Sequence, residues 1–438
     1  MVNVQSKRPR VRRLAMAVAI VALFLVSSLA ATRFVEGQTS DQITQTWAQQ
    51  MAAQWQPEVY HNMSFGALIT SASYDQIEYS YNTPAVLQGY LNLMESSGAG
   101  YIRIDVGYDA WLHDNLTVQK ELQSMVSQMR SDGKGFILAD AGAEAYRSNP
   151  LPWAQFQQAW IQRVTTLAAF FHPNYYIVIK EPGWYVPMIS DATTNPLVQS
   201  PAQWLNLTQY LTNAVLSVSP TTKVGVAIAA DGLNQQPSFY TAYLNGLPSI
   251  KGLSFMGFDI YTTSGFASTE SYLSQYGHGN LSLWMAECWS GSNPSVVYDS
   301  SRSTLDPIWM KAAYYFAQKE GFSMMVPFFT NLFASYSLTS TSPSTSSQII
   351  SLQQQRTPVF YMYQNVTSGL ENIPSSATTT STIYSSSTTP THTTTSTTSS
   401  HSTTVTPPAH TSTLLIIAAA VVIMVVVAVG YALTRKRK

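Results

Sequence analysis

Two glutamates end apolar segments that are typical of buried strands. Glu181 follows the run Tyr-Tyr-Ile-Val-Ile-Lys, and Glu287 follows Leu-Trp-Met-Ala. A carboxylate in such a place is costly unless it has charged partners or a chemical task. Two facing carboxyl groups can divide glycoside hydrolysis, because one protonates the leaving oxygen while the other attacks the anomeric carbon. The alternative for each is a structural glutamate held in a salt bridge.

The segments that must position these glutamates alternate between strand-like and helix-like patterns from about residue 60 to 370. We expect strands at 64–70, 101–106, 135–139, 175–179, 223–229, 252–260, 281–286 and 322–328. We expect helices at 85–96, 118–130, 153–171, 201–218, 239–247, 268–275, 307–320 and 353–364. Eight strand–helix units predict a single (β/α)8 TIM barrel. A doubly wound sheet is the alternative, although no G-x-G-x-x-G follows the first strand.

Barrel enzymes carry their chemistry where strands end and the following loops begin. The polar residues at those places here are Arg103, Asp105, Asp140, Lys180, Glu181, Asp259, Tyr261 and Glu287. Asp105 and Asp140 either bind sugar hydroxyls or serve as caps and loop contacts. Trp184 and Trp289 follow the two glutamates and are either platforms for sugar rings or loop-packing residues.

Over most of residues 60–370 the sequence resembles the clan of retaining (β/α)8-barrel glycoside hydrolases with catalytic glutamates after strands four and seven. Cellulases, mannanases and β-galactanases belong to this clan. Ile-Lys-Glu-Pro resembles its Asn-Glu-Pro motif and implies Glu181 as the acid/base, while Met-Ala-Glu-Cys-Trp implies Glu287 as the nucleophile. Arg103 resembles the arginine that supports the nucleophile. Tyr261 falls where the clan often has a tyrosine that is hydrogen-bonded to the nucleophile.

The sequence departs from this pattern at Lys180, which stands where the clan has an asparagine. That asparagine usually contacts the sugar 2-hydroxyl, and a lysine could also donate there. Its charge favours ionised Glu181, however, and would make Glu181 a poorer acid. Phe328 and Phe329 stand where a tryptophan platform is common. Two hypotheses follow: a glycosidase with an unusual substrate, or an inactive barrel that binds carbohydrate or serves as a surface-layer or adhesion protein.

Both ends of the chain predict export and anchoring. Residues 1–31 combine a basic start with an apolar run that ends in small residues, as in a signal peptide or signal anchor. Residues 414–434 form an apolar segment long enough for a transmembrane helix of roughly 30 Å. The basic tail 435–438 follows and indicates a cytoplasmic C-terminus.

Between these ends we expect a lead-in segment at 32–59, the glycosidase-like barrel at 60–370 and a stalk at 371–413. The stalk is rich in Ser and Thr and cannot bury enough apolar area to fold. Five N-x-Ser/Thr sites fit a glycoprotein: Asn62, Asn115, Asn206, Asn280 and Asn365. We therefore expect a single-pass cell-surface protein with an extracellular N-terminal domain. A stalked receptor-like binding protein with two lobes is a further alternative.

Composition and missing motifs exclude several classes. The single cysteine, Cys288, allows no disulfide framework and no thiolate zinc site. Nine of the 23 Lys and Arg lie at the two termini, so the middle is acidic and unsuited to nucleic acid. H-E-x-x-H, G-x-S-x-G and phosphate-loop motifs are absent from the sequence. The expected partner is a polysaccharide or glycan, with no metal and no cofactor.

Overall fold

A computed structural model describes residues 39–69, 84–140, 146, 149–291, 300–334 and 356–370. These residues all lie in the compact unit Met1–Thr379. The signal, stalk, membrane-helix and basic-tail predictions fall outside the described ranges. Within those ranges, no helix combines the length and apolarity needed to cross a membrane.

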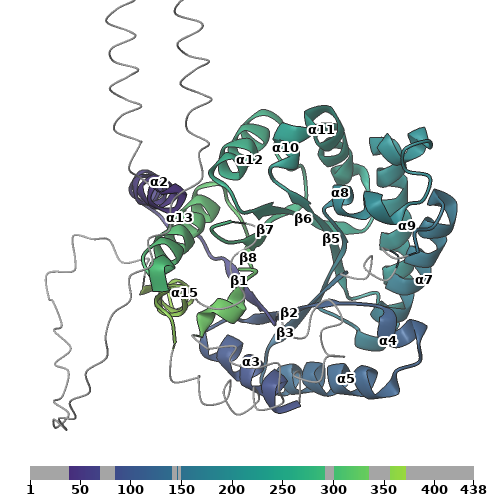
Figure 1. Cartoon of the computed structure of the whole chain (residues 1–438), viewed down its shortest axis with the longest axis horizontal. Helices are drawn as coiled ribbons and strands as arrows, with labels where there is room; N and C mark the ends of the chain where they lie inside the picture. Colours follow the sequence, from purple (N-terminus) through teal and green to yellow (C-terminus); the bar gives the residue numbers. More distant parts are fainter. Residues whose placement is uncertain are drawn as a thin grey trace, which may run out of the picture. The chain divides into compact units, whose positions relative to one another are not determined.

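Eight parallel strands follow one another around a closed barrel (Figure 1). They are β1 Ser64–Leu68, β2 Tyr101–Val106, β3 Gly135–Asp140, β4 Tyr175–Lys180, β5 Lys223–Ala229, β6 Leu253–Ile260, β7 Ser282–Cys288 and β8 Met324–Met325. β1 pairs with β8 through Ser64 and Met324, which closes the ring. The predicted (β/α)8 barrel is confirmed, and the described residues do not form the two lobes of the receptor-like alternative.

Helices form an outer ring around the strands (Figure 1). The longer ones are α2 Ser40–Trp55, α3 Pro84–Ser96, α5 Leu116–Ser131, α7 Trp153–Phe171, α9 Pro201–Val218, α11 Pro237–Gly246, α12 Thr263–Tyr276, α13 Leu305–Lys319 and α15 Pro358–Thr367. Single-turn helices are α4 Asp109–Leu112, α8 Pro182–Tyr185 and α10 Gly232–Gln235. The predicted limits of α7 and α9 agree with the structure.

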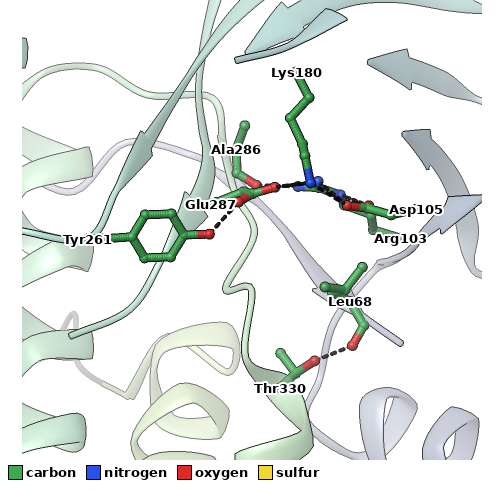
Figure 2. Close-up of polar contacts among 8 residues, drawn as sticks. All are labelled: Leu68, Arg103, Asp105, Lys180, Tyr261, Ala286, Glu287 and Thr330. Atoms are coloured by element: carbon green, nitrogen blue, oxygen red, sulfur yellow. Dashed lines mark hydrogen bonds and ion pairs between the residues drawn. The ribbon is translucent and has the colours of Figure 1, made fainter. Parts of the chain in front are cut away.

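Strand eight is shorter than predicted, with two residues instead of the expected segment 322–328. Pro327 has no N–H group, so it cannot continue a strand ladder. The following segment is tied down differently, because the hydroxyl of Thr330 donates a hydrogen bond to the carbonyl of Leu68 at the end of β1 (Figure 2).

The barrel interior is filled by apolar side chains from several strands: Ile137, Ala139, Ile177, Ala227, Phe255, Trp284, Ala286, Met324 and Val326. Phe255 and Trp284 stack at 3.8 Å between ring centroids. Gly225 makes room for Phe255, since a Cβ there would lie 2.4 Å from the ring. The barrel is therefore a packed core, and polar groups are left to the ends of its strands.

Helix α2 lies within the segment that we predicted only as a lead-in. The Gln42 N–H donates to the Thr39 hydroxyl oxygen, and the Thr39 N–H donates to the side-chain oxygen of Gln42, which forms a capping box. The helix packs on α13 (Figure 1). Trp55 contacts Phe266 and Phe316 with ring centroids 5.4 and 5.0 Å apart. Because glutamines are frequent in its sequence, the apolar face that these aromatic contacts bury is not evident from the sequence.

We predict that Trp55→Ala lowers the free energy of unfolding by about 3–5 kcal/mol, because Trp55 is 5% exposed and truncation leaves a cavity. Ile43→Ala on the same helix is the control, since Ile43 is 44% exposed and should change stability by only about 0.5 kcal/mol. Urea denaturation of both variants measures the difference. Equal stabilities would show that α2 does not belong to the cooperative core.

Candidate active site

Charged residues from β2, β4 and β7 meet at the carboxyl ends of their strands (Figure 2). Arg103 and Asp105 come from β2, Lys180 from β4 and Glu287 from β7. Tyr261 follows β6 and completes the group. The structure therefore brings together five of the residues that the sequence predicted for the site.

Arg103 lies at the centre of the charged group and is fully buried. It binds Asp105 with two donors, Nε to Oδ1 at 2.5 Å and Nη2 to Oδ2 at 2.9 Å. Nη2 also reaches Glu287 Oε1 at 2.6 Å, and Nη1 donates to the Ala286 carbonyl at 2.7 Å. Such charge-assisted bonds fix both the position and the orientation of the carboxylates.

Lys180 is a second buried cation beside the same carboxylates. Its Nζ lies 2.9 Å from Asp105 Oδ2 and 3.3 Å from Glu287 Oε1. It also lies 5.1 Å from the centroid of the Phe328 ring. Within the described residues, Lys180 therefore binds two carboxylates of the protein, those of Asp105 and Glu287.

Asp105 is an internal counter-ion. Burial alone would raise its pKa, but Arg103 and Lys180 outweigh burial and lower the pKa to about 2. Because its side chain is fully buried against these two cations, direct sugar binding by Asp105 is not supported. Its role is to position Arg103 and Lys180.

Glu287 is 3% exposed and is held by three donors. Arg103 and Lys180 contact Oε1, and the Tyr261 hydroxyl donates to Oε2 (Figure 2). Burial first and then the neighbouring Glu287 charge raise the pKa of Tyr261, so its hydroxyl stays protonated and available as a donor. The contacts to Arg103 and Tyr261 occur where the resemblance implied them.

Glu181 occupies a different environment from Glu287. It follows β4 with φ 52° and ψ 82°, in the left-handed region that strains a side chain other than glycine. Pro182 then begins helix α8, and the Glu181 N–H donates to the Ala227 carbonyl at 2.9 Å. This strained turn fixes a partly exposed carboxyl group directly after the buried strand.

The pKa of Glu181 is raised to about 7, first by burial and next by the charge of Glu287. Lys180 and Arg103 act in the opposite direction but are outweighed. The expected effect of Lys180 has the predicted direction, since its charge lowers the pKa of Glu181, but burial and Glu287 outweigh it. Near neutral pH the carboxyl group is divided between its two protonation states, as an acid/base requires.

A third carboxyl group, Asp259 at the end of β6, joins the two glutamates. Oxygen atoms of Glu181, Asp259 and Glu287 lie within 4.8 Å of one another. We noted Asp259 at a strand end but assigned it no role in the site. Alternation along β6 was the available signal, because Asp259 has the same parity as Phe255 inside the barrel.

Three close carboxylates can in general hold a hard cation. Arg103 and Lys180, however, already place two positive charges beside Glu287. Both oxygens of Glu287 are also in use by protein donors. We therefore assign none of these carboxylates as a metal ligand.

The structure gives a different outcome for each of the remaining predicted residues, Trp184, Trp289 and Asp140. Trp184 in α8 is 43% exposed, as a sugar platform would be. Trp289 is 1% exposed and packs against Phe329 and Phe333, which favours the loop-packing alternative. Asp140 ends β3, but its side chain lies outside the described part.

No family model and no curated protein matches the sequence. The chain is similar to a β-glucosidase from Thermotoga maritima, with TM-score 0.49 and 10% identity over 71% of this chain and 98% of that one. It is also similar to the exo-β-1,4-mannosidase Op5Man5 from Opitutaceae bacterium strain TAV5. That likeness has TM-score 0.47 and 10% identity over 72% of this chain and 61% of that one. Both of these structure neighbours are glycosidases.

We predict that Arg103→Gln costs about 3–5 kcal/mol of stability at neutral pH, because it leaves buried Asp105 and Glu287 without their main partner. The cost should shrink as pH falls from about 4 to about 2, since the low pKa of Asp105 stabilises the parent only while that carboxyl is ionised. Denaturation at several pH values measures both effects. Lys120→Gln, at an exposed position, is the control. An equal and pH-independent loss in both variants would contradict the network.

Proposed function

We propose that this chain is a surface-anchored retaining β-glycosidase that hydrolyses an extracellular polysaccharide or glycan. The observation that carries the proposal is the pair Glu181 and Glu287, whose oxygens lie within 4.8 Å in contrasting environments. A retaining mechanism needs carboxyl groups about 5–5.5 Å apart, whereas an inverting one needs about 6.5–9.5 Å. The spacing therefore favours retention.

In the first step Glu287 attacks the anomeric carbon and forms a glycosyl–enzyme bond. The glycosidic bond breaks, and Glu181 gives its proton to the leaving oxygen. Arg103, Lys180 and Tyr261 orient the attacking carboxylate through the contacts described above. The raised pKa of Glu181 leaves it a proton to give near pH 7.

In the second step a water molecule attacks the same carbon. Glu181, now ionised, takes a proton from that water, and Glu287 leaves as a carboxylate. Because Glu287 departs beside Arg103 and Lys180, its returning charge is stabilised at once. The site thus supplies one group that exchanges a proton and one that exchanges a covalent bond.

A carbohydrate-binding barrel without catalysis is the second candidate, and Lys180 favours it. Its ammonium group lies 3.3 Å from Glu287 Oε1, so it attracts electron density on the oxygen that Arg103 already holds. Two cations on one oxygen weaken a carboxylate as a nucleophile. This candidate keeps the barrel and the exposed Trp184 but predicts no turnover.

Surface anchoring is part of the proposal and rests on sequence. The signal segment 1–31, the stalk 371–413 and the apolar segment 414–434 support it. The glycosylation sites at Asn206 and Asn280 lie on exposed positions of the barrel, as sugar attachment requires.

We predict that Glu181→Gln lowers cleavage of an unactivated β-glycan by about 10²–10⁴-fold, because the leaving oxygen then lacks an acid. A dinitrophenyl glycoside should still glycosylate this variant, since its leaving group needs no proton. Glu287→Gln should lose both substrates. A panel of β-glucans, mannans, xylans and galactans with matching aryl glycosides measures this.

Glu58→Gln, at an exposed position, is the control and should behave like the parent. Turnover by Glu287→Gln would contradict the nucleophile assignment. If the parent cleaves no substrate while all variants bind the same glycan equally, the second candidate is correct.

We predict that the full chain fractionates with membranes and that a chain ending at residue 413 does not, because residues 414–434 supply the anchor. Fractionation of an expressing host followed by immunodetection measures this. Membrane association of the shortened chain would contradict the assigned anchor or reveal that 1–31 is retained as a second one.

A further inference from the structure

Asp259 is a buried carboxyl group to which the mechanism above gives no task. It is 2% exposed, and neither carboxyl oxygen has a hydrogen-bond donor in the part of the chain that the structure describes. Its neighbours in space include Glu181 and Glu287, with oxygens within 4.8 Å. An ionised carboxylate in such a place, without a donor, would destabilise the folded chain.

The charges around Asp259 show what it lacks. Arg103 on β2 and Lys180 on β4 face the cluster, but they contact Asp105 and Glu287. These contacts pair two cations with two carboxylates. Neither cation donates a hydrogen bond to Asp259 within the described residues. Their charges lower its pKa, but by less than burial and the two glutamates raise it.

The other titratable groups that the structure describes near Asp259 do not supply a counter-charge. Tyr261 follows Asp259 on its own segment, and its hydroxyl group donates a hydrogen bond to Glu287. Cys288 on β7 is buried, and burial raises the pKa of its thiol, so it stays neutral. Two carboxyl groups with oxygens within 4.8 Å of each other are more stable when one of them keeps its proton than when both are ionised.

We propose that Asp259 keeps a proton and donates it in a hydrogen bond to Glu181, so that Asp259 is a positioning residue for the acid/base. This inference rests on the proposed glycosidase function. The register of the sheet supports it, because Asp259 on β6 lies opposite Glu287 on β7 and both project toward the end of β4. Burial first, and then Glu287 and Glu181, raise the pKa of Asp259 well above its usual range.

The proposed bond acts when Glu181 is ionised. In the first step the Glu181 proton goes to the leaving oxygen, and the Asp259 hydroxyl then donates to the new carboxylate. In the second step Glu181 takes its proton from water, while the Asp259 proton stays on Asp259. The bond therefore stabilises the glycosyl–enzyme state and assists the second step. Its loss should slow the second step more than the first bond-breaking step, and should therefore lower kcat.

The proton itself can be tested without a substrate, by unfolding the parent and Asp259→Asn from about pH 4 to pH 8. A carboxyl whose folded pKa is raised loses stability as pH rises above its unfolded pKa of about 3.9. The unfolding constant of the parent should therefore rise relative to Asp259→Asn by up to about tenfold per pH unit. Exposed Glu58→Gln is the control. A difference that stays flat with pH shows that Asp259 is ionised when folded and overturns the proposal.

Positioning is tested by turnover of a dinitrophenyl glycoside, whose first step needs no acid. We expect Asp259→Leu to lower kcat at least tenfold and to accumulate the glycosyl–enzyme in a burst. Asp259→Asn keeps a neutral donor and should restore most of the rate. Equal losses in the two variants, or no loss in Asp259→Leu, overturn the positioning role. If the parent itself does not turn over, the proposed function fails, while the unfolding experiment still decides whether Asp259 holds the proton.

Discussion

The buried guanidinium of Arg103 joins the fold to the site. It reaches across the barrel mouth from β2 to the Ala286 carbonyl and the Glu287 carboxylate on β7. A fully buried cation is tolerable only when it is paired and hydrogen-bonded, and Asp105 supplies that pairing. Asp105 in turn holds Lys180, so three strands are locked to one another through a single ionic network. This ionic network fixes the position of Glu287.

The same network gives the two glutamates different character. Glu287 is surrounded by donors, whereas Glu181 is placed by a strained backbone turn and is left beside carboxyl groups. Under the proposed function, Glu287 is the carboxylate suited to attack and Glu181 the carboxyl suited to proton exchange, with oxygens within 4.8 Å of each other. Burial, and next the charge of Glu287, raise the pKa of Glu181 more than Lys180 lowers it. Lys180, the departure that suggested lost catalysis, therefore does not keep the pKa of Glu181 from rising to about 7.

Much of the barrel was predictable because its elements have simple local signals. Strands β2 and β5 and helices α7 and α9 are bounded by turn residues or prolines, and their predicted limits agree with the structure. Pro327 shortened β8 against an apolar pattern that suggested a longer strand. Helix α2 was missed because polar side chains dominate its sequence and only tertiary aromatic contacts reveal its buried face.

The sequence predicted which residues belong to the site better than it predicted what each residue does there. Strand ends identified Arg103, Lys180 and Glu287, yet Asp105 proved to be an internal counter-ion and Trp289 a packing residue. Those outcomes depend on distances and burial, which a sequence does not contain. The effect of Lys180 on Glu181 likewise depends on competing charges. The strand-end position of Asp259 was visible in the sequence, but its proximity to both glutamates appears only in the structure.

Covalent trapping of the nucleophile tests the account most directly. A fluorinated glycosyl fluoride slows hydrolysis of a glycosyl–enzyme enough for peptide mass spectrometry to locate the attached sugar. We predict a sugar attached to Glu287 in the parent and no attached sugar in Glu287→Gln. A sugar attached to another residue, or substrate turnover with no trapped species, would contradict a retaining mechanism built on the Glu181 and Glu287 pair.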